Sequence, residues 1–114
     1  MQFARRYRDR GATWGRIATL TSGGRDGFLE ITYGTAKAAL ESYMLSAARE
    51  PAKTGTTANI VYPPVTDPGW VNDGVPELVA ASTDHIYVAE PTDVAEGIAW
   101  LCSDSARMVT ANVI

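Results

Sequence analysis

Segments with strand periodicity and segments with helix periodicity alternate along the chain, and this alternation limits the possible folds more than any other feature. Short apolar, β-branched runs at 16–21, 57–62 and 109–114 predict three strands. Apolar residues at helical spacing over 33–49 and 91–103 predict the helices that separate them. Strands joined through helices pair in parallel by right-handed crossovers. We therefore expect an α/β fold with a small parallel sheet of about three strands and flanking helices.

Length and composition describe one globular domain covering residues 1–114. Hydrophobic residues make up 46% of the chain and charged residues 20%, which is the balance of a folded domain. No apolar run approaches the roughly 18–20 residues that span a bilayer, and no secretory signal is visible. The only cysteine, Cys102, cannot form an intramolecular disulfide, and its position on the apolar face of helix 91–103 predicts burial. We expect a cytoplasmic protein without a membrane partner.

Charge is distributed unevenly, but its pattern does not favour a nucleic-acid partner. Residues 1–25 carry six arginines and one aspartate, whereas residues 26–114 carry twelve acidic and four basic residues. A basic segment can bind nucleic acid, but no aromatic ladder or zinc spacing accompanies it, and the acidic remainder would repel phosphate. No pair of carboxylates is spaced to suggest a metal site, and the single histidine, His85, lies in a polar segment. A small-molecule substrate is the partner that remains.

Ser22, Tyr33 and Lys37 are the residues best suited to catalysis. Tyr33 and Lys37 are four residues apart on a predicted helix, so their side chains point the same way. An ammonium group beside a phenol favours the phenolate form, and the phenol can then serve as a general acid or base. Ser22 ends the first predicted strand, at the edge where open parallel sheets bind their ligands. We expect the three side chains to converge there, with the Ser22 hydroxyl bonded to a substrate oxygen.

Residues 15–114 resemble the C-terminal half of a short-chain dehydrogenase/reductase. The resemblance implies a truncated Rossmann-like sheet and NAD(P)-dependent interconversion of a carbonyl compound and an alcohol. The matching segments follow one another in the family's order: Gly15-Arg16-Ile17, Thr21-Ser22, Tyr33-Gly34-Thr35-Ala36-Lys37, Ala58-Asn59-Ile60-Val61-Tyr62-Pro63, Pro91-Thr92-Asp93-Val94 and Val109-Thr110.

The resemblance also implies a role for each candidate residue. Ser22 would polarise the substrate oxygen, Tyr33 would exchange its proton, and Lys37 would favour ionisation of the phenol and hold the nicotinamide ribose. Pro63 and Val65, which follow the second strand, would also meet a bound dinucleotide.

Self-association is expected from the helix predicted at 33–49. Its apolar residues extend around much of its circumference, beyond what one face of a sheet can cover, and related enzymes dimerise through the corresponding helix. We therefore expect a homo-oligomer. The residues are Ala38, Ala39, Leu40, Tyr43, Met44 and Ala47.

Among the ways in which the chain departs from the family, the lack of a pyrophosphate turn leaves a second function open. The glycine-rich pyrophosphate turn of these enzymes, G-x-G-x-x-G, does not occur in the 114 residues, and we expect the N-terminal dinucleotide-binding half to be absent. The alternative is a hydrolase without a cofactor, acting on esters or lactones. In that enzyme Ser22 would be the nucleophile, Tyr33 and Lys37 would activate it, and the backbone amides of Gly23-Gly24 would bind the oxyanion.

Overall fold

The computed structural model describes residues 2–22, 31–67, 69, 74–81 and 87–114. The elements follow the predicted alternation of helix and strand. In chain order they are α1 (Gln2–Asp9), β1 (Gly15–Leu20), α2 (Ile31–Ala47), the 3-10 helix η1 (Pro51–Thr54), β2 (Thr56–Val61), α3 (Gly74–Ala81), α4 (Pro91–Leu101) and the 3-10 helix η2 (Asp104–Ala106).

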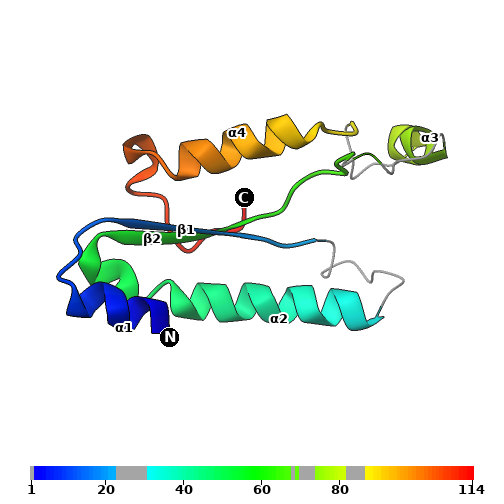
Figure 1. Cartoon of the computed structure of the whole chain (residues 1–114). Coiled ribbons are helices and arrows are strands. Elements are labelled where there is room, and N and C mark those ends of the chain that lie inside the picture. Colours follow the sequence, from blue (N-terminus) through cyan, green and yellow to red (C-terminus); the bar gives the residue numbers. More distant parts are fainter. Residues whose placement is uncertain (1, 23–30, 68, 70–73, 82–86) are drawn as a thin grey trace.

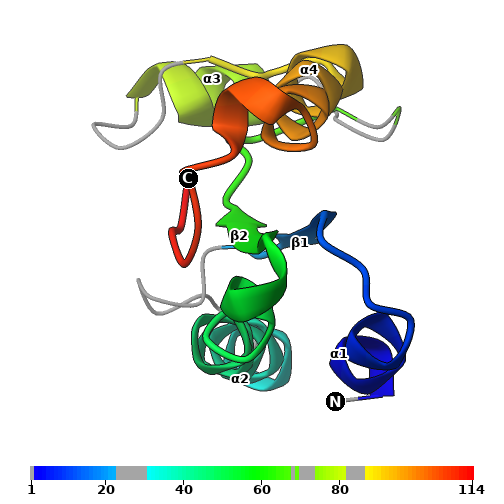
Figure 2. The same ribbon diagram turned by 90° about the vertical axis from the view of Figure 1, so that its left-hand side faces the viewer.

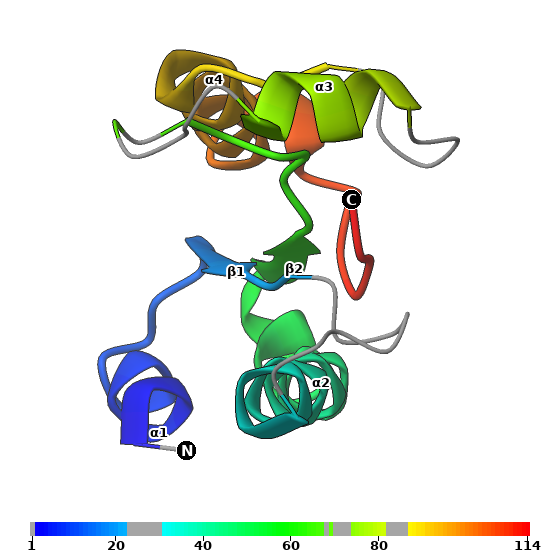
Figure 3. The ribbon, with the colours of Figure 1, turned by 90° about the vertical axis from the view of Figure 1, so that its right-hand side faces the viewer.

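The elements form three layers, with the two strands in the middle. Helices α1 and α2 lie against one face of the sheet, whereas α4 lies against the other, with α3 beside it in the same layer (Figures 1, 2 and 3). The strands β1 and β2 pair in parallel, from Gly15 opposite Thr56 to Leu20 opposite Val61. The α/β class and the parallel pairing of these two strands are therefore confirmed.

The third predicted strand is reduced to an isolated bridge. Val113 pairs in parallel with Ile60 of β2, and the Ile60 amide donates to the Asn112 carbonyl oxygen at 2.9 Å. The Ile114 amide in turn donates to the Ile60 carbonyl oxygen at 2.9 Å. Ala111 has a φ of 60°, in the left-handed region, so an extended strand over 109–114 is interrupted at this residue. The described residues thus form a two-stranded sheet, with the C-terminal segment on the far side of β2.

Strand β2 is the centre of the fold because both of its faces are covered. All six of its residues are buried. Alternate side chains enter two apolar clusters, one toward α2 and one toward α4, as strand geometry requires. The first cluster contains Met44, Ala48, Ala58 and Ile60, with Ile17, Leu40, Leu45 and Val113 packed against it. The second contains Val61, Leu101 and Ala106, with Val94, Ile98 and Val109 packed against it.

Two helices have bounds that differ from the sequence expectation. Helix α2 begins two residues earlier than predicted and ends at Ala47, because the chain turns before Pro51, which disfavours a preceding helical residue. Helix α4 ends at Leu101, and Cys102 is its C-cap and is exposed. The predicted burial of Cys102 is wrong, since Leu101 occupies the buried position at the end of this helix.

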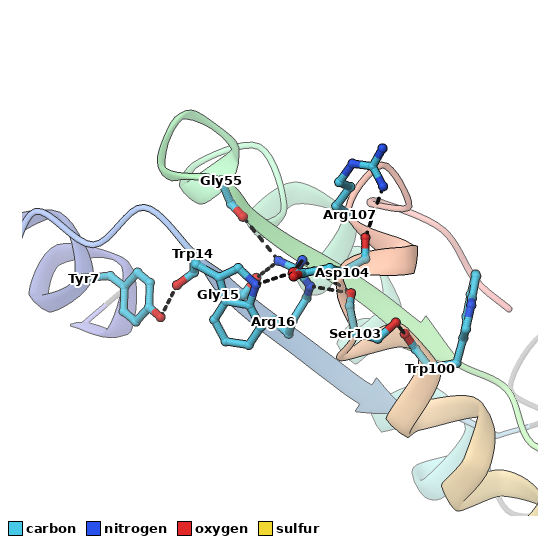
Figure 4. A network of polar contacts seen from close by, with 9 residues as sticks. All are labelled: Tyr7, Trp14, Gly15, Arg16, Gly55, Trp100, Ser103, Asp104 and Arg107. Carbon is cyan, nitrogen blue, oxygen red and sulfur yellow. Dashed lines mark hydrogen bonds and ion pairs between the residues drawn. The ribbon is translucent and has the colours of Figure 1, made fainter.

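The Arg16 side chain joins the amino-terminal ends of the strands to the layer of α4 (Figure 4). This side chain is only 5% exposed, and its guanidinium donates to the carbonyl oxygens of Ser103 and Gly55, each at 3.4 Å. It also stacks over the Trp14 ring at 4.7 Å and lies 3.6 Å from a carboxylate oxygen of Asp104. The same carboxylate oxygen accepts a hydrogen bond from the Trp14 indole at 3.1 Å. One buried guanidinium therefore connects three chain segments that are distant in sequence.

The molecule is elongated for its length. Its radius of gyration is 16.2 Å and its principal extents are 51 × 29 × 23 Å. A compact domain of this length has a radius of gyration of about 13 Å. The accessible surface is 7825 Å², whereas a compact monomer of 12.2 kDa exposes about 6,000 Å². The fold therefore leaves more surface uncovered than a compact monomer of the same mass.

Candidate active site

The candidate site lies at the carboxyl edge of the sheet, where both parallel strands end. Ser22 follows β1 by two residues, and Pro63 follows β2 by two residues. Leu20 pairs with Val61, so Ser22 and Pro63, each two residues further along, leave the sheet at the same level. Helix α2 starts beyond the same edge and runs back beneath the sheet, antiparallel to the strands (Figure 1). This topology brings the first turns of α2 to the end of β1.

Tyr33 and Lys37 lie together on α2, as their spacing predicts. The Lys37 ammonium nitrogen is 5.5 Å from the centre of the Tyr33 ring. Tyr33 is 41% exposed, so its ring remains accessible to a substrate, whereas Lys37 is half-buried. The Lys37 ammonium also donates a hydrogen bond of 3.3 Å to the backbone oxygen of Leu20, the last residue of β1. The cation is therefore held between the tyrosine ring and the strand that leads to Ser22.

Ser22 is half-buried, and the residue before it is fixed from two sides. The Thr21 amide donates to the carbonyl oxygen of Val61 at 2.9 Å, which extends the pairing with β2. The Thr21 hydroxyl donates to a carboxyl oxygen of Glu41 on α2, also at 2.9 Å. Sequence reasoning missed Thr21 and Glu41. The available signal was an acidic residue one helical turn after Lys37, directly after the apolar run Ala38-Ala39-Leu40.

Of the other predicted positions, some lie among the residues that the structure describes and some lie outside them. Pro63 and Val65 are half-buried in the segment after β2, close to the sheet edge. The Val65 carbonyl oxygen accepts from the Ala89 amide at 2.7 Å, which ties this segment to the chain just before α4. The amides of Gly23 and Gly24, invoked for the hydrolase alternative, lie outside the described residues, as does His85.

The residues present fit the nicotinamide-ribose end of a dinucleotide. An ammonium group carries three donor hydrogens, and the Lys37 contact with Leu20 uses one of them, which leaves capacity for a ribose hydroxyl. The sequence contains no G-x-G-x-x-G turn, so it lacks the usual contacts to the pyrophosphate. The described residues include no group of three or more histidine, cysteine or acidic side chains arranged to hold a metal ion. None of the helices described is long and apolar enough to cross a bilayer.

Comparisons with known proteins identify the family of the chain. The family model described as enoyl-(acyl carrier protein) reductase matches residues 1–114. The uncharacterized oxidoreductase YjdA of Bacillus subtilis is 34% identical over 100% of this chain and 46% of its own length. An acetoacetyl-CoA reductase of Cupriavidus necator is 32% identical over 90% of this chain and 43% of its own length.

A solved structure gives the same result at the level of the fold. The angucycline C-6 ketoreductase LanV with bound NADP superposes with a TM-score of 0.77 at 33% identity, over 90% of this chain and 42% of LanV. The chain therefore spans less than half the length of these relatives. The match over the whole chain, the α/β architecture and the oxidoreductase relatives together establish that the chain belongs to the short-chain dehydrogenase/reductase family.

Proposed function

We propose that this chain carries the catalytic residues of an NAD(P)-dependent carbonyl reductase or alcohol dehydrogenase acting on a small molecule. The observation that carries the proposal is the contact between Lys37 and Tyr33 beside the end of the strand that leads to Ser22. Relatives named as a ketoreductase with bound NADP and an acetoacetyl-CoA reductase support this class of reaction.

The proposed chemistry divides the work among three side chains. A nicotinamide dinucleotide supplies the hydride when it is bound. In the reductive direction Tyr33 gives its phenolic proton to the carbonyl oxygen, and Ser22 donates a hydrogen bond to that oxygen. The ammonium of Lys37 stabilises the resulting phenolate and holds a ribose hydroxyl. An alcohol leaves, and the Tyr33 phenolate recovers its proton from solvent.

The contacts that this chain can make differ between the two ends of the dinucleotide. Tyr33, Lys37, Pro63 and Val65 would contact the nicotinamide end, and the sequence offers no glycine-rich turn for the pyrophosphate. We therefore expect these 114 residues to bind NADH or NADPH weakly, with dissociation constants toward the millimolar range.

The test combines a binding titration with two activity assays. Nicotinamide fluorescence and calorimetry, with NADH and NADPH up to millimolar concentration, measure binding. Reduction of a panel of ketones and aldehydes, followed by loss of absorbance at the reduced nicotinamide, measures turnover. We expect Ser22→Ala to lower this turnover about 100-fold, since it removes one donor to the developing oxyanion.

The outcome that overturns the proposal is equally specific. Absence of nucleotide binding and of nucleotide-dependent turnover would exclude a reductase function for this chain. Ester hydrolysis without nucleotide, with an acyl group attached to Ser22 in the mass spectrum, would instead establish the hydrolase alternative. The reductase forms no acyl adduct in either the parent protein or Ser22→Ala.

We also propose that two copies of the chain associate through α2. Met44 and Ala47 of this helix are buried against the sheet, whereas Ala38, Ala39 and Tyr43 are exposed. The surface in excess of that of a compact monomer supports the same conclusion. At tens of micromolar we expect light scattering to give twice the monomer mass, and Ala39→Glu to restore the monomer because it places charge in the contact. A monomer mass for the parent protein would refute this association.

A further inference from the structure

The contact between Thr21 and Glu41 is a buried polar pair at a position where packing alone would favour apolar side chains. Thr21 is 2% exposed and Glu41 is 6% exposed, and they meet between the sheet and α2. Removing a carboxyl group from water is unfavourable even when it is hydrogen-bonded, and an apolar pair of similar volume is often as stable or more stable. The placement of Glu41 therefore calls for a reason other than stability.

Glu41 lies one helical turn after Lys37, and both residues reach the same short piece of β1. Lys37 donates to the backbone oxygen of Leu20, and Glu41 accepts from the hydroxyl of Thr21. These are consecutive residues at the end of the strand. The two contacts and the intervening helical turn close a ring of interactions between α2 and the strand end.

The ring leaves little freedom to the peptide that carries Ser22. The Thr21 amide is already bonded to the Val61 carbonyl oxygen, so Thr21 is held by β2 through its backbone and by α2 through its side chain. Ser22 is attached to this residue by one peptide bond. A displacement of about 1 Å in a reacting group can cost about 100-fold in rate.

We infer that Glu41 is a positioning residue which, through the Thr21 hydroxyl, sets the place of Ser22 relative to Tyr33 and Lys37. This inference rests on the proposed function, because it concerns the same three side chains. It adds a fourth and a fifth residue that act on the geometry of the site without touching the substrate.

The decisive variant replaces both members of the pair by apolar residues of similar volume. Thr21→Val/Glu41→Leu removes the donor and the acceptor of this hydrogen bond together, so neither is left without the other, and the melting temperature should stay close to that of the parent protein. Turnover of the reductase reaction should nevertheless fall about 10- to 100-fold, with the loss in kcat rather than in KM. If the pair had a purely structural role, turnover would instead change in parallel with the melting temperature.

Conservative variants provide the matched controls. Glu41→Gln retains a side-chain oxygen that can accept from Thr21, and Thr21→Ser retains the hydroxyl. Both should keep turnover within about threefold of the parent protein. Equal losses in Glu41→Gln and Glu41→Leu would overturn the inference, because the hydrogen bond would then be irrelevant to the effect.

A measurement without turnover separates this inference from the proposed function. Amide proton–nitrogen spectra of the uniformly labelled chain report the surroundings of Thr21 and Ser22 whether or not a nucleotide binds. We expect the double variant to shift the Ser22 amide resonance and to accelerate exchange of the Thr21 amide, whereas Thr21→Ser leaves both near their parent values. An unchanged Ser22 resonance together with parent-level turnover in the double variant would refute the positioning role. Absence of turnover in the parent protein would refute only the proposed function.

Discussion

Tyr33→Phe should lower nucleotide-dependent turnover by two to four orders of magnitude while leaving the fold intact. The substitution removes the one group that exchanges a proton with the substrate oxygen and keeps the ring that packs beside Lys37. Since Tyr33 is 41% exposed at the start of α2, loss of its hydroxyl should not disturb the core. Turnover at saturating ketone and nucleotide measures the first effect, and thermal unfolding followed by circular dichroism measures the second.

Tyr87→Phe is the matched control for this change. Tyr87 is 52% exposed and lies before α4, and its substitution makes the same chemical change on a comparably accessible ring. We expect parent-level turnover from this variant. A folded Tyr33→Phe protein that retains full turnover would show that the proton comes from another group.

Arg16→Leu should cause the largest loss of stability of any single substitution proposed here. The guanidinium is buried and supplies hydrogen bonds to the carbonyl oxygens of Ser103 and Gly55 (Figure 4). A leucine leaves these oxygens without that donor and removes the cation stacked on Trp14. We expect the free energy of unfolding to fall by about 2–4 kcal/mol, which corresponds to roughly 10–20 °C in Tm.

The ion pair in the same network should contribute far less. Asp104 is 86% exposed, so water and salt screen its interaction with Arg16, and Asp104→Asn should change stability by about 0.5 kcal/mol or less. The asparagine oxygen can still accept from the Trp14 indole. If urea unfolding gave equal losses for Arg16→Leu and Asp104→Asn, the ion pair would outweigh the contacts between the guanidinium and the carbonyl oxygens.

The elements that sequence reasoning predicted correctly are those defined by local patterns. The β-branched run at β1 and the run ending at Tyr62 each carry their own periodicity, and Pro91 with Asp93 is typical of a helix start. The contact between Tyr33 and Lys37 follows from helical spacing alone. None of these features depends on knowing which distant segment lies nearby.

Features that depend on distant segments were not accessible in the same way. Helix α2 carries apolar residues around most of its circumference, so the pattern did not identify the face that meets the sheet. Ala39 and Tyr43 of the predicted stripe are exposed, whereas Glu41 is buried. The partner of Glu41 is Thr21, on a strand that only the tertiary fold brings to it. The C-terminal pairing was likewise overestimated, because the left-handed backbone at Ala111 leaves no trace in the hydropathy pattern.

The order in which β2 acquires its neighbours has a consequence for the speed of folding. Gly15 pairs with Thr56 across the whole of α2, and Ile60 pairs with Val113 across both α3 and α4. Parallel pairings between such distant residues require long loops to close before any contact forms, and chains dominated by them fold slowly. During synthesis the second edge of the central strand stays uncovered until residues 111–114 have been made. Until then an apolar strand with an unpaired edge is exposed to other chains, so the yield of native protein should depend on temperature and on expression rate.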